Sequence, residues 1–229
     1  MVLATVPPTQ PKTKPALELS LHELSQVVAT CTACRLCDGR IQTVFADGPV
    51  TARLMVIGEG PGQQEDEQGL PFVGRSGQLL TQILASGGFH RASQVGMEAA
   101  NVYIANIVKC RPPQNRAPVA DEMAACKPYL EEQIRLIQPA LILLAGATAV
   151  KGILTPQTAA KAVGITKIRG QWFPTPYVGR DGHPIPAMPI FHPAYLLRNP
   201  VEAPGSPKAL MWDDIQTVRQ ELDRRLALE

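Results

Sequence analysis

Four short apolar runs constrain this chain more than any other feature, because each has the length and composition of a buried strand. They are separated by long helical or loop-like stretches and comprise Leu54–Ile57, Val102–Ile104, Leu141–Leu144 and Met188–Phe191. Short runs of branched residues that are apolar on both faces are typical of parallel strands covered by helices. We therefore predict an α/β fold, a three-layer αβα sandwich around a central four-stranded parallel sheet.

Helical patterns occupy the segments between and after these runs. Ser76 is a candidate N-cap for a helix that ends at Gly87–Gly88, and Ser206–Leu226 has the pattern of a long amphipathic helix. The apolar residues that recur on one face of each helix are Leu79, Leu80, Ile83 and Leu84 in the first, and Leu210, Ile215, Val218 and Leu222 in the second.

The two ends of the chain differ in composition. Residues 1–17 contain Pro7, Pro8, Pro11 and Pro15 and lack the apolar core of a secretory signal, so we expect a flexible proline-rich tail. Residues 18–229 are expected to form one domain. No run of about 18 apolar residues occurs, which predicts a cytoplasmic protein without a membrane span.

The net charge of the chain is a first indication of whether it binds nucleic acid. At +2 over 229 residues it is too small to indicate a nucleic-acid binder by itself, since a basic footprint needs clustered lysine and arginine. The site must therefore be sought in local motifs.

Ligands collect at the carboxyl ends of the strands in sheets of this kind. The sequences that follow the four runs are "GEGPGQQED", "NIVKCRPPQNRAP", "AGATA" and "HPAYLLRNP". Three of the four place polar groups in an otherwise apolar context, which predicts a binding site at this edge of the sheet.

Five cysteines form two groups. Cys31, Cys34 and Cys37 lie within seven residues, and Cys110 and Cys126 follow in the middle of the chain. Disulfides are disfavoured without an export signal. Four thiolates from two distant segments suit either a structural zinc or a [4Fe–4S] cluster, and the spacing alone does not choose between them. One cysteine is surplus to a four-ligand site.

The glycine-rich loop after the first run is a poor phosphate site. Pro61 removes a backbone donor, Glu59 repels a diphosphate, and the Gly-Lys-Ser/Thr ending of a P-loop is missing. Carboxylates beside a close-approach loop suit a reaction centre that becomes positive, such as an oxocarbenium-like sugar.

Together, "CTACRL" with Arg40, "GEGPGQQEDEQGLPFVGRSGQLL", "NIVKCRPPQNRAP" and "FHPAYLLRNP" resemble the signature segments of the iron–sulfur (family 4) uracil-DNA glycosylases. The resemblance extends from about Leu19 to Leu226. It implies the fold of that superfamily and a [4Fe–4S] cluster whose ligands match Cys31, Cys34, Cys110 and Cys126. Cys37 is then the spare thiol.

The resemblance also implies a substrate and a readout. Uracil arises in DNA by cytosine deamination, and an enzyme that removes it must flip the nucleotide into a pocket. Asn106 matches the residue that recognises uracil, Phe72 the one that stacks on it, and His192 the one that stabilises the leaving anion. Backbone at Gly60 and Pro61 is expected to contact the ring.

The acids and the DNA-contacting residues are expected as follows. Glu59 and Glu65 lie near the sugar or pocket as catalytic candidates, with exclusion of the thymine methyl group as an alternative for Glu65; the water-activating residue is unassigned. Asp66 and Glu67 are expected at a helix start or in solvent. The candidates for DNA contact are Leu196 or Leu197 as a wedge, Arg198 and Lys208 at phosphates, and Asn115.

The leading interpretation is a monofunctional base-excision-repair glycosylase that releases free uracil and leaves an abasic site, with no lysine indicated as a Schiff-base nucleophile. It predicts a nucleoid-associated monomer acting on single- or double-stranded uracil-containing DNA. A role of the tail in binding a replication clamp has no support in the sequence. Two alternatives stay open: a metal-stabilised nucleic-acid-binding module without turnover, and an iron–sulfur electron carrier.

Overall fold

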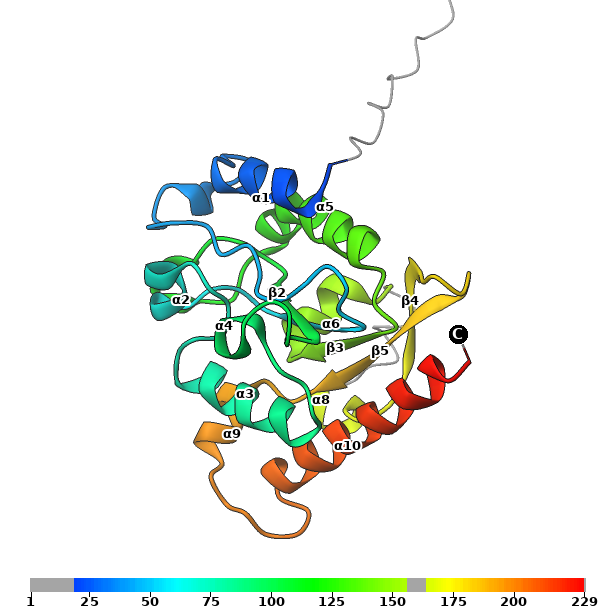
Figure 1. Cartoon of the computed structure of the whole chain (residues 1–229). Coiled ribbons are helices and arrows are strands. Elements are labelled where there is room, and N and C mark those ends of the chain that lie inside the picture. Colours follow the sequence, from blue (N-terminus) through cyan, green and yellow to red (C-terminus); the bar gives the residue numbers. More distant parts are fainter. Residues whose placement is uncertain (1–18, 156–163, 229) are drawn as a thin grey trace, which may run out of the picture.

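A computed structural model describes residues 19–155 and 164–228, so the expected tail at residues 1–17 lies outside the described residues. Its centre is a five-stranded sheet with the strand order β2-β1-β3-β5-β4 (Figure 1). The strands are β1 (Leu54–Gly58), β2 (Val102–Asn106), β3 (Leu141–Ala145), β4 (Phe173–Val178) and β5 (Pro184–Ile190).

The α/β prediction is confirmed, but the count of four strands is wrong. The four apolar runs form β1, β2, β3 and β5, which pair in parallel. The additional strand, β4, is antiparallel to β5 at the sheet edge. Its sequence, "FPTPYV", contains two prolines that cannot donate to a ladder, which confines such a segment to an edge and hides its strand pattern.

Helices cover both faces of the sheet and separate two apolar cores (Figure 1). Side chains alternate along β1: Met55 and Ile57 face one core, whereas Leu54 and Val56 face the other. The first core is completed by α5 (Ala120–Ile137) and α6 (Ala147–Ile153), with α1 (Leu21–Ala29) packed on α5. The second is completed by α3 (Arg75–Ser86), α9 (Pro193–Arg198) and α10 (Pro207–Leu226).

Short elements complete the described chain. They are η1 (Arg35–Cys37), α2 (Gln63–Gln68), α4 (Ala92–Val95), η2 (Pro113–Asn115) and α8 (Ile165–Ile168). Within the described ranges, no helix is both long and apolar enough to cross a membrane.

The two predicted helices form, with one correction at a cap. The expected C-terminal helix is α10, and Ser206 caps it by accepting a hydrogen bond from the Ala209 amide at 3.3 Å. The N-cap of α3 is Gly74 rather than Ser76. The reason is tertiary: Glu65 accepts a hydrogen bond from the Gly74 amide at 2.8 Å, so a side chain from α2 satisfies the start of α3. Ser76 lies inside the helix and lines a pocket instead.

Parallel strands place their carboxyl ends together, and these ends determine where the site lies. Asn106 is the last residue of β2, Glu59 follows β1, Gly146 follows β3, and His192 comes two residues after β5. Four segments that are far apart in the sequence therefore meet at one edge of the sheet.

Candidate active site

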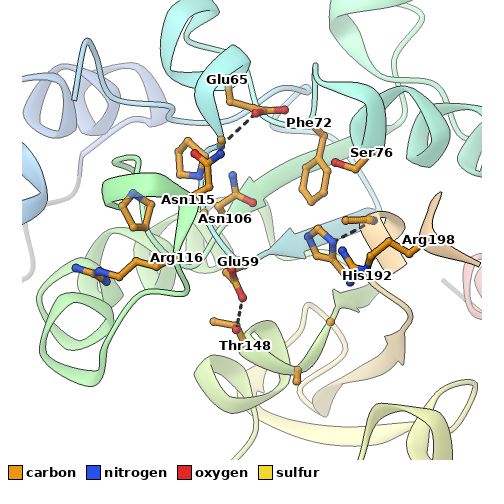
Figure 2. Close-up of a pocket in the computed structure, with 17 residues that line it drawn as sticks. Glu59, Glu65, Phe72, Ser76, Asn106, Asn115, Arg116, Thr148, His192 and Arg198 are labelled. Atoms are coloured by element: carbon orange, nitrogen blue, oxygen red, sulfur yellow. Dashed lines mark hydrogen bonds between the residues drawn. The ribbon is translucent and has the colours of Figure 1, made fainter. Parts of the chain in front are cut away.

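A pocket of about 500 Å³ opens at this edge (Figure 2). It is lined by residues from all four strand ends and from the start of α3: Glu59, Gly60, Pro61, Gly62, Glu65, Phe72, Ser76, Asn106, Pro112, Asn115, Arg116, Gly146, Ala147, Thr148, His192, Ala194 and Arg198. Every residue expected to bind the substrate lies in this wall.

Asn106 has an unsatisfied polar atom. Its side chain is buried, and its Oδ1 has no hydrogen-bond partner within the described structure. A buried amide oxygen without a partner costs about 1–3 kcal/mol, so its retention needs an explanation. An incoming donor in the pocket would satisfy it.

Gly58 gives Asn106 its room. The two residues are paired in register across β1 and β2. A Cβ at position 58 would lie 2.5 Å from Asn106 Oδ1 and 2.4 Å from Phe72 Cζ. Only glycine therefore allows the amide and the aromatic ring to converge on the same spot.

Phe72 adopts a left-handed backbone conformation, with φ of 53°, which is unusual for an aromatic residue. The turn is held from two sides. Gly77 of α3 packs so closely that a Cβ there would lie 2.0 Å from the Phe72 carbonyl group. The buried Arg91 donates hydrogen bonds to the carbonyl oxygens of Phe72 and Pro71. The ring is thereby fixed with its centroid 6.2 Å from that of His192.

His192 is the N-cap of α9, and its Nδ1 accepts a hydrogen bond from the Ala194 amide at 3.2 Å (Figure 2). Burial lowers the pKa of His192 below its ordinary value, and this outweighs the opposite effect of the nearby Glu59. The ring is neutral at pH 7. Because Nδ1 is an acceptor, the single ring proton is on Nε2.

The two acids of the glycine-rich loop lie in different surroundings. The Glu65 carboxylate accepts hydrogen bonds from three amides, those of Gly62, Val73 and Gly74, at 2.8–3.1 Å. It ties the loop after β1 to the turn that contains Phe72. Glu59 accepts a hydrogen bond from the Thr148 hydroxyl, and its carboxylate lies at the lower side of the pocket in Figure 2.

Asp66 lies in the first turn of α2, so the expected helix start is confirmed, but the residue does not face solvent. Its side chain is buried and accepts hydrogen bonds from the Ile41 and Gln42 amides at 3.0 and 3.3 Å, which anchors the cysteine-rich segment to α2. This contact joins residues 25 positions apart, so local sequence gave no sign of it. Glu67 is exposed, as expected.

The wedge alternatives separate clearly. Leu196 is fully buried in the core beneath α9, so it cannot enter a duplex, and the expectation for it is wrong. Leu197 is 37% exposed beside it. On a short helix that packs one face on the core, adjacent residues point in different directions. Leu197 is the remaining candidate.

The expected DNA-contacting polar residues also differ in placement. Arg198 lines the pocket, whereas Lys208 pairs with Glu202 at 2.7 Å. Asn115 has φ of 57° and accepts a hydrogen bond from Arg111 Nε at 2.7 Å. This bond fixes the loop after β2, which contributes Asn115 to the pocket lining.

Four cysteines line one small cavity between the N-terminal segment and α5: Cys31, Cys34, Cys110 and Cys126. Donors surround their sulfurs, including Arg40 Nη1 to Cys110 at 3.1 Å, the Lys109 amide to Cys126 at 3.3 Å and Tyr129 to Cys31 at 3.2 Å. Burial raises the pKa of Cys126 to about 11, so near neutral pH this thiol stays protonated unless a bound cation displaces the proton. The donor set fits a thiolate-bound group.

Cys37 is not in the lining of that cavity, and its thiol donates to Asp38 at 3.3 Å. Among the described residues, no set of three or more histidine, cysteine or acidic side chains has the arrangement of a site for a single metal ion.

Sequence reasoning missed several residues of the site, namely Thr148, Arg116, Ser76 and Arg91. Thr148 lies in "AGATA", the one strand end whose sequence was not counted among those with polar groups, although ligands collect at every such end. Arg116 lies across the pocket from Arg198 in Figure 2 and makes a bidentate pair with the buried Glu122 at 2.7–2.8 Å. Arg91 is far from every motif, and no local signal identified it.

Comparison with known proteins agrees with this geometry. The sequence model of the uracil DNA glycosylase superfamily matches residues 45–216. The type-4 uracil-DNA glycosylase of Thermotoga maritima is 44% identical over 77% of this chain and 82% of its own length. Those of Sulfurisphaera tokodaii and Saccharolobus solfataricus are 36% and 37% identical, over 88% and 79% of this chain and 84% and 79% of their own lengths. The chain therefore belongs to the uracil DNA glycosylase superfamily, with type-4 enzymes among its relatives.

Proposed function

We propose that this chain is a monofunctional uracil-DNA glycosylase of base excision repair, which flips uracil out of DNA and hydrolyses the bond between base and deoxyribose. The observation that supports this most directly is the unpartnered Oδ1 of Asn106 inside the pocket. Uracil N3–H donates to that oxygen, while the Asn106 amide nitrogen donates to uracil O4. Uracil thus supplies the hydrogen-bond donor that Asn106 Oδ1 lacks within the described structure.

Cytosine presents the opposite pattern, with an acceptor at N3 and a donor at the exocyclic amine. Bound in the same place, cytosine would set its N3 acceptor against the Asn106 oxygen and its amine donor against the Asn106 amide nitrogen. Each mismatch would cost about 1–3 kcal/mol. Phe72 stacks on the face of the base. Its ring is pre-positioned by the strained turn, so little ordering is needed when the base enters.

His192 acts on the leaving group. As the glycosidic bond breaks, negative charge develops on uracil O2, and the Nε2–H of a neutral imidazole stabilises it there. Glu59 lies in the same pocket as a carboxylate beside the sugar, where positive charge develops. Glu65 has a structural role instead, because both of its oxygens hold the pocket wall together.

Leu197 enters the space that the flipped nucleotide leaves, and Arg198, which lines the pocket, contacts a phosphate beside that nucleotide. No lysine lines the pocket in the described ranges. The buried Lys109 instead donates to the Asn106 carbonyl oxygen and to Gln133. Strand cleavage through a Schiff base is therefore not part of the proposed reaction.

Cys31, Cys34, Cys110 and Cys126 would hold a [4Fe–4S] cluster, as the resemblance implies. Such a cluster would cross-link the N-terminal segment, the loop that follows Asn106 and α5. The surrounding donors, Arg40 above all, stabilise the thiolate ligands. The protein acts as a monomer on genomic DNA in the cytoplasm.

The test is an oligonucleotide assay with the purified, full-length protein. We expect free uracil and alkali-labile breaks only at uracil, with matched cytosine and thymine oligonucleotides left intact. Omitting alkali should leave the strand unbroken. Tight binding without release of uracil would contradict the proposal and favour the non-catalytic module.

A further inference from the structure

Thr148 and Glu59 approach one another from opposite parts of the chain. Thr148 lies in the first turn of α6, and its hydroxyl donates a hydrogen bond to Glu59 Oε2, 89 positions earlier (Figure 2). Both side chains line the pocket. The bond is therefore a contact within the site itself, between the loop that follows β1 and the first turn of α6.

Among the described residues, the Glu59 side chain makes one hydrogen bond, and its partner is Thr148. Glu65, six positions later, accepts from three backbone amides and is fixed without any help from a hydroxyl. A glutamate has three rotatable side-chain bonds, so holding it in one orientation has a large cost in conformational entropy. The orientation of Glu59 therefore depends on a single neighbour.

Thr148 is well suited to fix a carboxylate. Its branched Cβ restricts χ1. Its helix is anchored in the core by the buried Ala149, Val150 and Ile153. The turn before it, at Gly146, has φ of 92° and packs against the Cβ of His192, so the same backbone segment also borders the histidine.

We infer that Thr148 is a positioning residue for catalysis: by binding Oε2 it holds the Glu59 carboxylate with Oε1 directed to the reacting sugar and its attacking water. The inference rests on the proposed glycosylase function and deepens it. Thr148 does not touch the substrate in this scheme. Its contribution is exerted through Glu59, so it should vanish when Glu59 is absent.

The first measurement is single-turnover cleavage of a uracil-containing oligonucleotide. Thr148→Val keeps the shape of the side chain and removes the donor, so we expect the rate constant of bond cleavage to fall about tenfold while the Kd for DNA changes less than twofold. Thr148→Ala should behave in the same way, and Thr148→Ser, which keeps the hydroxyl, should recover most of the rate. Thr217→Val, which removes an exposed hydroxyl on α10, is the matched control.

The second measurement is a double-mutant cycle. In a Glu59→Ala background, Thr148→Val should have no further effect on the rate, because no carboxylate is left to orient. Additive losses would overturn the inference, as would a Thr148→Val enzyme with the wild-type rate. Equal loss of rate and melting temperature in Thr148→Val and Thr148→Ser would assign the residue a purely structural role. Failure of the glycosylase proposal is separate, because wild-type protein would then release no uracil.

Discussion

Arg91 donates a hydrogen bond to the carbonyl oxygen of Phe72 at 2.6 Å, and the same guanidinium pairs with Asp47 at 2.7 Å. Both charged side chains are buried, and Asp47 also accepts from the amide and hydroxyl of Ser93. Phe72, which we propose to stack on the base, is thus held in its left-handed conformation by an ion pair that lies outside the pocket lining.

Removing this arginine should affect both stability and substrate binding. We expect Arg91→Met to lower the free energy of unfolding by about 3–5 kcal/mol, because it leaves Asp47 buried without its cation. The freed Phe72 turn should also raise KM for uracil-containing DNA. Chemical denaturation and steady-state kinetics measure the two effects. Arg219→Met, which breaks a partly exposed pair with Asp223 on α10, is the control and should cost less than about 1 kcal/mol.

Asn106→Asp tests the readout of the base. An aspartate offers acceptors only, so it loses the donor to uracil O4 and gains an acceptor for the cytosine amine. We expect kcat/KM for uracil to fall about 100-fold and slow release of cytosine to become detectable. Asn101→Asp, at an exposed loop where Oδ1 is already an acceptor, should leave both rates unchanged. Unchanged kinetics in Asn106→Asp would refute the assigned role.

The pH dependence of cleavage tests the neutral histidine. Burial lowers the pKa of His192, so the ring takes up its second proton only below the ordinary value of about 6.5. That proton goes to Nδ1 and abolishes its bond from the Ala194 amide, so we expect the rate to be level near pH 7 and to fall on the acid side. A rate that falls instead as the pH rises through 7 would indicate a required imidazolium.

Variants separate this effect from other titrations. His192→Gln keeps a donor but does not titrate, so its slower rate should lack the acid limb. His192→Ala should slow cleavage by about 10²–10³-fold and weaken DNA binding far less. The reason is that the hydrogen bond from His192 strengthens only when negative charge forms on the departing base. The reverse ranking would contradict stabilisation of the leaving anion.

Leu197 and Leu196 form a natural pair for testing the wedge. Leu197→Ala should slow uracil release from duplex DNA more than from single strands, since only a duplex leaves a gap to fill, and should barely change stability. Leu196→Ala removes a core side chain and should cost about 2–5 kcal/mol of unfolding free energy. Equal effects of Leu197→Ala on duplex and single-stranded substrates would remove its wedge role.

The cysteines give a test of the cluster that does not rely on activity. We expect Cys126→Ala to lose iron and visible absorbance and to melt at a lower temperature, because a cross-link between two segments is lost. Cys37→Ala, whose thiol lies outside the cavity, should keep its iron and its stability. A colourless, zinc-containing wild-type protein would contradict the iron–sulfur proposal.

The sequence alone determined the framework of this protein. The runs that became β1, β2, β3 and β5 are apolar on both faces because they are buried on both faces, so their pattern identified the sheet and its carboxyl edge. The ends of these runs placed Asn106 and His192 at this edge, and the family resemblance implied their roles. β4 escaped because its two prolines suit an edge strand and obscure its pattern.

The tertiary structure decided how the site residues are held and which of two neighbours does what. Leu196 and Leu197 are adjacent and identical in type, and only the packing of α9 separates a core residue from an exposed one. Asp66 and Arg91 became parts of the scaffold through partners 25 and 44 positions away, and the role proposed for Thr148 depends on its hydrogen bond to Glu59 on another strand end. The periodicity of a sequence shows on which side of its helix or strand a residue lies. Hydrogen bonds between elements depend instead on how those elements pack in space, which the periodicity does not contain.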